Sequence, residues 1–441
     1  MRCKQPRQEP FGLSTMTTMA RLLPRPASPR LAILLIFLSP PFFLDFSFES
    51  PDDSPAQATV ESYYRQWLEL LAEEHSLPPA DFSAKSDALI DELFALDSLA
   101  PGALSDEWGS LTADEQTEFI EALRSSIKNK LLSYFDGDPQ RITSYTLTRD
   151  EASDRSATLE YSVKAEDEQQ TLTVDMLRTP DGSWRIGDVE YGDTSALGFY
   201  RTLASKLLEQ YSFPYLVAEL GEYPFVVLED FEASSVGELP ARWSWKGKDD
   251  DKRKPYRVRQ EEDGNKYLQA TDEGESVILG KDIKWDLRKY PYVSFRWRVH
   301  EVPEGADERF DETVDSAAGI YFVYRNVLGR IPRSVKYVWS STLPVGSATR
   351  RDGVGKPWMV VAESGTERTG EWHTYVFDLR EAYEKTFGGR PPDKPIGIGI
   401  LSDANSTKSH AYADYDNIRA LRTADRDVTS GVEQILKANE P

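Results

Sequence analysis

Cysteine and histidine are scarce in this chain of 441 residues. The only cysteine is Cys3, so the chain beyond it contains no disulfide, no thiolate metal ligand and no cysteine nucleophile. The four histidines, at positions 75, 300, 373 and 410, are widely separated and include no paired spacing of the kind that binds zinc. These absences exclude cysteine chemistry and count against a zinc enzyme.

Common catalytic motifs are also missing. The segment that ends at Lys356 fails as a phosphate-binding loop, because Arg350 stands where its first glycine belongs and Pro357 follows the lysine. No G-x-S-x-G elbow and no H-E-x-x-H pair occurs. The polar segment at 403–407 lacks the glycine and the final glutamate of an EF-hand loop. The sequence therefore favours a protein that is not an enzyme, without excluding one.

Positive charge is in deficit as well. The chain has 74 Asp and Glu residues against 52 Lys and Arg residues, a net charge of −22. Nucleic-acid binding depends on cationic side chains, so this balance argues against DNA or RNA as the main partner. The composition is 39% apolar and 11% aromatic, which is typical of a folded protein, and the length suggests two or three domains of about 100–200 residues.

Residues 1–58 have the features of an export signal. Residues 1–50 contain six basic and three acidic side chains, which leaves a net charge of −25 on the rest of the chain. The apolar run at 31–44 is fourteen residues long and contains Pro40 and Pro41, whereas a membrane span needs about 20 apolar residues. A basic segment before a short apolar run is typical of a secretory signal.

Two fates of this segment remain open. Ala56, Gln57 and Ala58 offer a small-residue cleavage site, but it lies far from the apolar run, so an uncleaved inner-membrane anchor is the alternative. No cysteine follows the apolar run, which argues against a lipoprotein. The expected location is the periplasm.

Residues 59–222 have the pattern of an α+β domain. Apolar spacing predicts helices over 60–71, from a capping box at Thr112 and Glu115 to residue 134, and over 197–208. Four strands are predicted between them, at 142–148, 157–163, 172–176 and 184–191. Pro78 and Pro79 are expected to end the first helix. The helices should pack on one face of a curved antiparallel sheet.

Residues 223–422 change in character to about ten short strands separated by turns. This pattern predicts an all-β sandwich of jelly-roll type, with one helix near 379–386. Residues 423–441 form a charged tail. Tryptophan rings in the sandwich could bind glycan by stacking on sugar C–H groups, or could simply form its core. The candidates are Trp243, Trp245, Trp339, Trp358 and Trp372.

Two groups of acidic residues in the same region also have alternative interpretations. If the first and last strands lie together, Asp230 and Glu232 would meet Asp414 and Asp416 and could bind a structural calcium ion; the alternative is a set of solvent-exposed acids. The second group could supply a pair of carboxyl groups for glycoside hydrolysis, but a solvated loop is the favoured interpretation. Its members are Asp307, Glu308, Asp311, Glu312 and Asp315.

The first domain resembles the MlaC family, the toluene-tolerance auxiliary components of ABC transporters. The segments that carry the resemblance are 108–134, 175–178, 182–189 and 195–201. The resemblance implies a periplasmic carrier that moves phospholipid between outer and inner membranes, with acyl chains held between helices and a curved sheet. Membrane proteins of lipid transport would be its partners.

The second domain resembles a bacterial family of unknown function, DUF3047. The segments that carry this resemblance are 228–232, 295–299, 315–324, 337–339 and 396–407. The resemblance implies a galactose-binding-like or concanavalin-like fold, and no established activity.

Lipid binding requires a volume walled by apolar side chains. The predicted wall comprises Phe119, Leu123, Ile127 and Leu131 from a helix, Val174, Met176, Trp184 and Ile186 from strands, and Leu197, Tyr200 and Leu203 from the last helix. The alternative is that these side chains only pack against one another. Our first hypothesis is an exported phospholipid carrier fused to a binding module. The second is a glycan-binding or glycan-cleaving envelope protein in which the sandwich is the active part.

Overall fold

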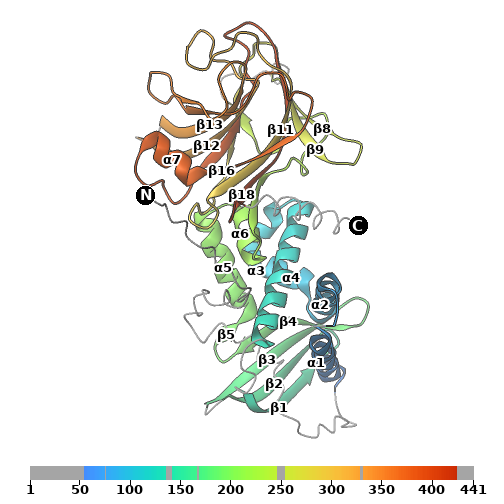
Figure 1. Cartoon of the computed structure of the whole chain (residues 1–441). Helices are drawn as coiled ribbons and strands as arrows, with labels where there is room; N and C mark the ends of the chain where they lie inside the picture. The colour runs from blue at the N-terminus through green and yellow to red at the C-terminus, as the bar shows by residue number, and fades with distance from the viewer. Residues whose placement is uncertain are drawn as a thin grey trace, which may run out of the picture.

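The computed structural model describes residues 54–74, 76–135, 142–165, 168–245, 254–327 and 331–424. The predicted export signal and the charged tail lie almost entirely outside these residues. Within the described ranges, no helix is both long enough and apolar enough to cross a membrane. Figure 1 shows two folded parts, one in which helices lie against a sheet and one built mainly of strands.

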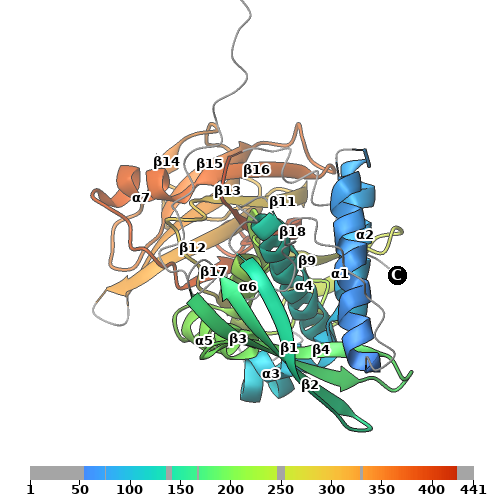
Figure 2. The same ribbon diagram turned by 90° about the horizontal axis from the view of Figure 1, so that it is seen from below.

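The first domain is an α+β domain, as the sequence predicts. Its helical elements are α1 (Pro55–Glu73), α2 (Pro79–Leu93), α3 (Leu96–Leu104), the 3-10 helix η2 (Ser105–Ser110), α4 (Ala113–Phe135), α5 (Ala196–Gln210) and α6 (Phe213–Leu220). Its antiparallel sheet has the order β1 (Ile142–Ala152), β2 (Ser156–Ala165), β3 (Glu168–Arg178), β4 (Trp184–Tyr191) and β5 (Thr194–Ser195). Helices α1 and α2 lie side by side (Figure 2).

Pro78 and Pro79 begin a helix as well as ending one. Pro79 is the first residue of α2, where a missing N–H costs nothing and the fixed φ of proline suits the helix. Residues 79–104, for which no helix was expected, therefore form α2 and α3. The chain between these helices is tied to the sheet, because the Ala95 backbone N–H donates to the Ile186 carbonyl at 2.9 Å.

The capping box that begins α4 is confirmed. The backbone N–H of Thr112 donates to Glu115 Oε2 at 2.9 Å, and the backbone N–H of Glu115 donates to Thr112 Oγ1 at 3.3 Å. These two bonds satisfy donors that the first helical turn leaves free. Glu115 also accepts a hydrogen bond from Arg242 Nη2 of the second domain at 2.6 Å.

In the residues that the structure describes, the second domain has two sheets and one helix. One sheet has the order β14 (Ala348–Thr349), β15 (Trp358–Ser364), β13 (Ile331–Ser340), β12 (Ala318–Val327), β17 (Gly397–Ile400), β10 (Leu279–Asp282) and β7 (Ser244–Trp245). The other has β16 (His373–Asp378), β11 (Tyr292–Glu301), β18 (Ala411–Leu421), β9 (Lys266–Asp272) and β8 (Tyr256–Gln260), with β6 (Phe225–Glu229) also paired to β18. Helix α7 spans Leu379–Phe387.

An aromatic core joins the two sheets. The Phe295 ring of β11 lies 6.4 Å from the Phe322 ring of β12 and 6.1 Å from the Tyr337 ring of β13, between ring centres. The ring of Tyr337 also stacks on Phe377 of β16 at 4.0 Å. The prediction of a β-rich domain with packed sheets is confirmed. The parallel pairing of β13 with β15 differs from the antiparallel neighbours of a jelly roll.

The two domains meet where α6 leads into β6, and Tyr290 is central to this junction. Its buried hydroxyl lies 3.1 Å from Glu219 Oε1 and 3.2 Å from the Tyr223 carbonyl oxygen, and it accepts from Arg422 Nη2 at 2.9 Å. Lys289 also pairs with Glu219. Helix α6 contacts β6, which pairs with β18, at this junction (Figure 1).

We expect Tyr290→Phe to lower the free energy of unfolding by about 1–2 kcal/mol, because the change removes a buried hydrogen-bonding group. This corresponds to a fall in melting temperature of about 2–4 °C for each kcal/mol in domains of this size. Calorimetry on the full chain measures it. Tyr292→Phe is the matched control, and an equal loss in both variants would contradict the role of the Tyr290 hydroxyl.

Candidate functional site

The predicted apolar wall of the first domain comes together in one buried cluster. Phe119, Leu123, Ile127 and Leu131 lie on one face of α4, and each is at most 1% exposed. Their spacing of three or four residues places them on the same side of the helix. Helix α4 therefore presents a continuous apolar face to the rest of the domain.

The sheet and α5 provide the other sides of this cluster. Residues of β3 and β4 alternate between the two faces of the sheet, so every second side chain faces the helices. The predicted sheet residues Val174, Met176, Trp184 and Ile186 are all buried in the cluster, Tyr200 of α5 is 4% exposed, and Leu197 and Leu203 pack against it while partly buried. The structure thus brings together all of the predicted wall residues.

A polar group interrupts this apolar cluster, and the sequence pattern did not reveal it. Ser126 of α4 is 2% exposed and accepts hydrogen bonds from Lys130 Nζ and, at 3.5 Å, from the Tyr200 hydroxyl. The Lys130 ammonium also lies 5.7 Å from the centre of the Phe199 ring and 5.2 Å from that of Tyr200. Lys130 lies three residues after Ile127, next to the apolar stripe of α4. A charged residue at this position is the sequence feature that could have indicated the polar group.

Burial shifts the pKa values of this polar group. It lowers the pKa of Lys130 to about 8, although nearby Glu222 favours the charged form, and it raises the pKa of Tyr200 to about 12. Tyr200 is therefore neutral near pH 7, while Lys130 is mostly charged. The first domain thus combines an apolar cluster with one cation at its α4–α5 side.

The tryptophans proposed for glycan binding differ in exposure. Trp243 is 6% exposed and donates to Glu229 Oε2 at 2.7 Å, and Trp339 is fully buried and donates to the Gly365 carbonyl at 2.8 Å. Neither ring can lie against a glycan, so the prediction is wrong for both. Both are large apolar side chains at inward-facing positions, so they form part of the core, which was the alternative to glycan binding.

The other three tryptophans are partly buried. Lys254 Nζ lies 3.7 Å from the Trp245 ring centre, and Trp358 packs against the core of the second domain. The guanidinium groups of Arg296 and Arg298 lie 4.8 and 4.6 Å from the Trp372 ring centre. Cations near the Trp245 and Trp372 rings make cation–π contacts that compete with sugar stacking there.

Two of the four carboxylates proposed for calcium binding, Asp414 and Asp416, are held by arginines instead. Asp416 accepts from Arg296 Nε at 2.9 Å, while Asp414 accepts from Arg298 Nε at 2.8 Å and lies 2.7 Å from His300 Nε2. Strands β6 and β18 do pair, as expected, but Asp230 and Glu232 do not complete a cluster with Asp414 and Asp416. Among the residues that the structure describes, no group of three or more His, Cys, Asp or Glu could hold a metal ion.

The acidic loop before β12 is solvated only in part, since Asp311 and Glu312 are exposed and the other candidates are not. Glu308 and Asp315 are fully buried, whereas Asp307 and Asp311 pair with Arg309 and Arg351. Ser340 and Ser316 hydroxyls donate to Glu308 at 2.7 and 3.2 Å. Asp315 accepts from the backbone N–H groups of Ser406 and Thr407 at 3.1 and 2.6 Å, and from the Thr407 hydroxyl at 2.7 Å. Local sequence could not show these partners, because they lie far along the chain.

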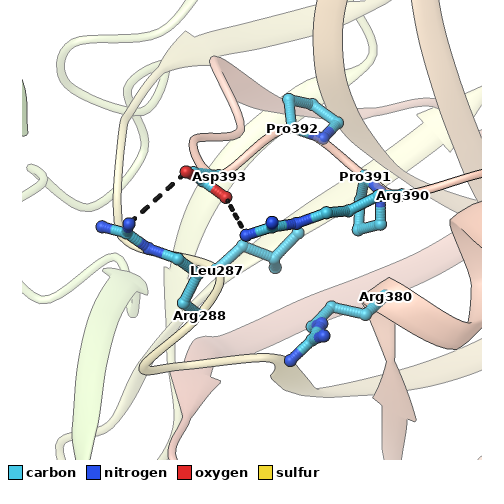
Figure 3. A pocket seen from close by; sticks show the side chains of 7 residues that line it. All are labelled: Leu287, Arg288, Arg380, Arg390, Pro391, Pro392 and Asp393. Atoms are coloured by element: carbon cyan, nitrogen blue, oxygen red, sulfur yellow. Dashed lines mark hydrogen bonds and ion pairs between the residues drawn. The ribbon is translucent and has the colours of Figure 1, made fainter.

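A shallow pocket lies on the second domain beside α7 (Figure 3). It is lined by Leu287, Arg288, Arg380, Arg390, Pro391, Pro392 and Asp393. Asp393 accepts from Arg390 Nη2 at 3.1 Å and pairs with Arg288 at 3.4 Å, so it neutralises part of the local positive charge. Asp393 thus pairs with two of the three arginines that line the pocket.

Both halves of the chain match known families. Residues 61–222 match the family described as MlaC protein, and residues 241–419 match the family described as protein of unknown function, DUF3047. These matches confirm the two resemblances seen in the sequence. No protein in the search of curated proteins matches the chain.

Several solved structures are similar to parts of the chain. A phospholipid-binding protein from Ralstonia solanacearum, solved with a phospholipid, is 17% identical over 38% of this chain and 96% of its own, with a TM-score of 0.29. A family 30 carbohydrate binding module is 12% identical over 41% of this chain and 87% of its own, with a TM-score of 0.22. Both scores are too low to carry a functional conclusion.

We expect calcium to leave the stability of the protein unchanged, because Arg296 and Arg298 already neutralise the carboxylates of Asp416 and Asp414. The melting temperature should therefore be the same, within error, in excess EDTA and in millimolar calcium chloride. Magnesium chloride at the same ionic strength controls for salt. A rise in melting temperature with calcium but not with magnesium would contradict this expectation. If Asp230→Asn abolished that rise, the result would support a calcium site.

Proposed function

We propose that this chain, whose first domain matches the MlaC family, is an exported phospholipid carrier of the bacterial periplasm. The first domain holds the acyl chains between α4, α5 and the sheet. The second domain serves as a binding module that docks the carrier on an envelope component. Lipid-transport proteins of the inner or outer membrane deliver and receive the lipid.

The family match over residues 61–222 carries this proposal. The apolar cluster supports it, because its side chains come from two helices and from the sheet, as a wall around acyl chains requires. The polar group of Ser126, Lys130 and Tyr200 supports a phospholipid in particular. A phosphate near the Lys130 ammonium would offset the cost of burying its charge.

The net charge of −25 beyond residue 50 bears on how lipid is exchanged. Anionic lipid headgroups give a membrane surface a negative potential, which repels an acidic protein. Transfer through docking on membrane proteins therefore suits this chain better than direct adsorption on a bilayer.

We expect the full chain, purified from periplasm without added detergent, to contain about one phospholipid per molecule by native mass spectrometry. Ala122 is fully buried on α4, so Ala122→Phe should fill the space of an acyl chain and remove most of the bound lipid. Ala113→Phe, at an exposed position of the same helix, is the matched control and should keep its lipid.

A packed core would give the opposite pattern. The unmodified chain would contain no phospholipid, and Ala122→Phe would lower the free energy of unfolding by about 1–3 kcal/mol through overpacking. That pair of results would reject the carrier function.

Lys130 provides a pH-dependent test of the headgroup contact. Because its pKa in the folded protein is about 8, the ammonium charge is lost as the pH rises from 7 to 9, and phospholipid retention should fall with it. Lys130→Met should retain less phospholipid at pH 7 and show no change up to pH 9. Lys206→Met, at an exposed position of α5, is the control.

The stability of the lipid-free protein should also depend on the protonation of Lys130. The unfolded chain keeps the Lys130 proton up to a pKa near 10.5, whereas the folded chain loses it near 8, so the unfolded state binds more protons between these values. The free energy of unfolding should therefore rise with pH in this range, and Lys130→Met should remove that rise. A pH profile that is identical in the two proteins would contradict the buried position of the ammonium.

A further inference from the structure

The shallow pocket beside α7 carries positive charge that the lipid-carrier function does not use. Three segments of the second domain line it: the turn at 287–288 before β11, the first turn of α7 with Arg380, and the chain at 390–393 after α7. The backbone N–H of Leu287 donates to the Asp393 carbonyl at 2.8 Å, which ties two of these segments together. Figure 3 shows that each segment contributes one arginine side chain to the pocket.

Arg380 is the arginine whose role the fold does not explain. Its backbone N–H donates to the capping residue Asp378 at 2.8 Å, but within the described ranges no hydrogen bond or ion pair reaches the guanidinium group of this exposed residue. Arg380 also lies in the first turn of α7, where the helix dipole disfavours a positive charge. A cation at this position contributes little to the stability of the helix, so its charge is available to a ligand.

Arg390 also has donors that a ligand could use. Its side chain is 71% exposed, and with the described residues it makes a single hydrogen bond, from Nη2 to Asp393 Oδ1 at 3.1 Å. A guanidinium group has five N–H donors, so most of those of Arg390 face solvent. The buried Pro391 follows it and restricts the backbone, so that a ligand has to order only the side chain of Arg390.

The third arginine is already paired, and the pocket as a whole stays positive. Arg288 donates to Asp286 from Nε at 2.9 Å and from Nη2 at 2.6 Å, and it also pairs with Asp393. Three guanidinium groups thus face two carboxylates, which leaves one positive charge, and Lys394 adds a second beside the pocket. The chain beyond residue 50 has a net charge of −25, so this positive surface belongs to an otherwise acidic protein.

The position of Asp393 decides which anion suits the pocket. Its carboxylate lies between Arg288 and Arg390, so a compact ion of high charge such as phosphate would be placed close to it and repelled. Carboxylates spaced along a peptide can instead reach Arg380 and Arg390 separately from the solvent side, and each can accept two parallel N–H bonds. An anionic bilayer would also face exposed acids of α7 such as Glu381.

We propose that this pocket docks an acidic peptide segment of a partner protein, whose carboxylates bind Arg380 and Arg390. The inference rests on the docking role proposed for the second domain, and it supplies the surface and the chemistry of that contact. Asp393 acts as an internal competitor, because it accepts the N–H bond from Arg390 that a partner carboxylate would otherwise accept. Pro392, partly exposed in the same pocket, offers the segment an apolar contact.

The test uses the full chain and a short fluorescent peptide of alternating aspartate and alanine, with the asparagine–alanine peptide as its neutral counterpart. Fluorescence anisotropy measures binding. We expect Arg380→Met and Arg390→Met each to weaken binding of the acidic peptide by at least about fivefold, since each removes a charge-assisted contact, and Asp393→Asn to strengthen it by at least about twofold. Lys385→Met removes the same charge from an exposed, ion-paired position of α7 outside the pocket, and it should bind as the unmodified chain does.

Melting profiles check that the variants are folded, as expected for side chains that are exposed or partly exposed. The proposal is overturned if the acidic peptide does not bind, if the neutral peptide binds equally well, if folded Arg380→Met binds normally, or if Asp393→Asn weakens binding. It is also overturned if inorganic phosphate, phosphatidylglycerol vesicles or a peptide of residues 423–441 binds more tightly than the acidic peptide and loses that binding in Arg380→Met, because another occupant would then use the pocket. Phospholipid content, measured on the same samples, reports on the first domain separately, so a failure of the docking site is distinguishable from a failure of the carrier function.

Discussion

A buried charge is costly unless an opposite charge or several hydrogen bonds lie beside it, and this constraint arranges the polar side chains of the whole protein. In the six-stranded sheet the opposite charges are in direct contact, since Arg296 and Arg298 pair with Asp416 and Asp414 on the neighbouring strand. At the domain junction, Lys289 and Arg422 form ion pairs with Glu219. Most buried charges of the described residues therefore have a structural explanation.

Two lysines have fewer polar partners than these charged groups. Lys130 reaches a serine hydroxyl and the faces of two aromatic rings, and the Lys336 ammonium lies 5.4 Å from the centre of the Tyr321 ring. In each case an apolar surface lies close by. A lysine that is costly to bury and could be compensated by a ligand is a stronger indication of a binding site than a lysine with a complete set of partners. Lys130 of the first domain is such a position.

The sequence was most informative where a pattern is local. The stripe from Phe119 to Leu131 predicted the buried face of α4, and the capping box at Thr112 predicted where that helix begins, because both depend on spacing within a few residues. The proline pair at 78 and 79 misled in one respect: proline ends a helix and also suits the first turn of the next. Choosing between these roles requires the packing of α2.

Long-range pairing explains what the sequence could not reveal. Nothing near Asp315 in the sequence indicates that the backbone around Thr407 will bind it, and nothing near Lys336 indicates that Gly319 will leave space for its side chain. Lys336 lies opposite Tyr321, at a position of β13 that faces away from the core between the sheets, and such a position normally means exposure to water. Val314 and Leu343, from the segments on either side of β12 and β13, pack against Val338 of the same face, and Asp311 pairs with Arg351 between these segments. Periodicity in the sequence encodes neither contact. A polar residue on the outer face of a sheet is therefore informative only when the structure also shows what covers it.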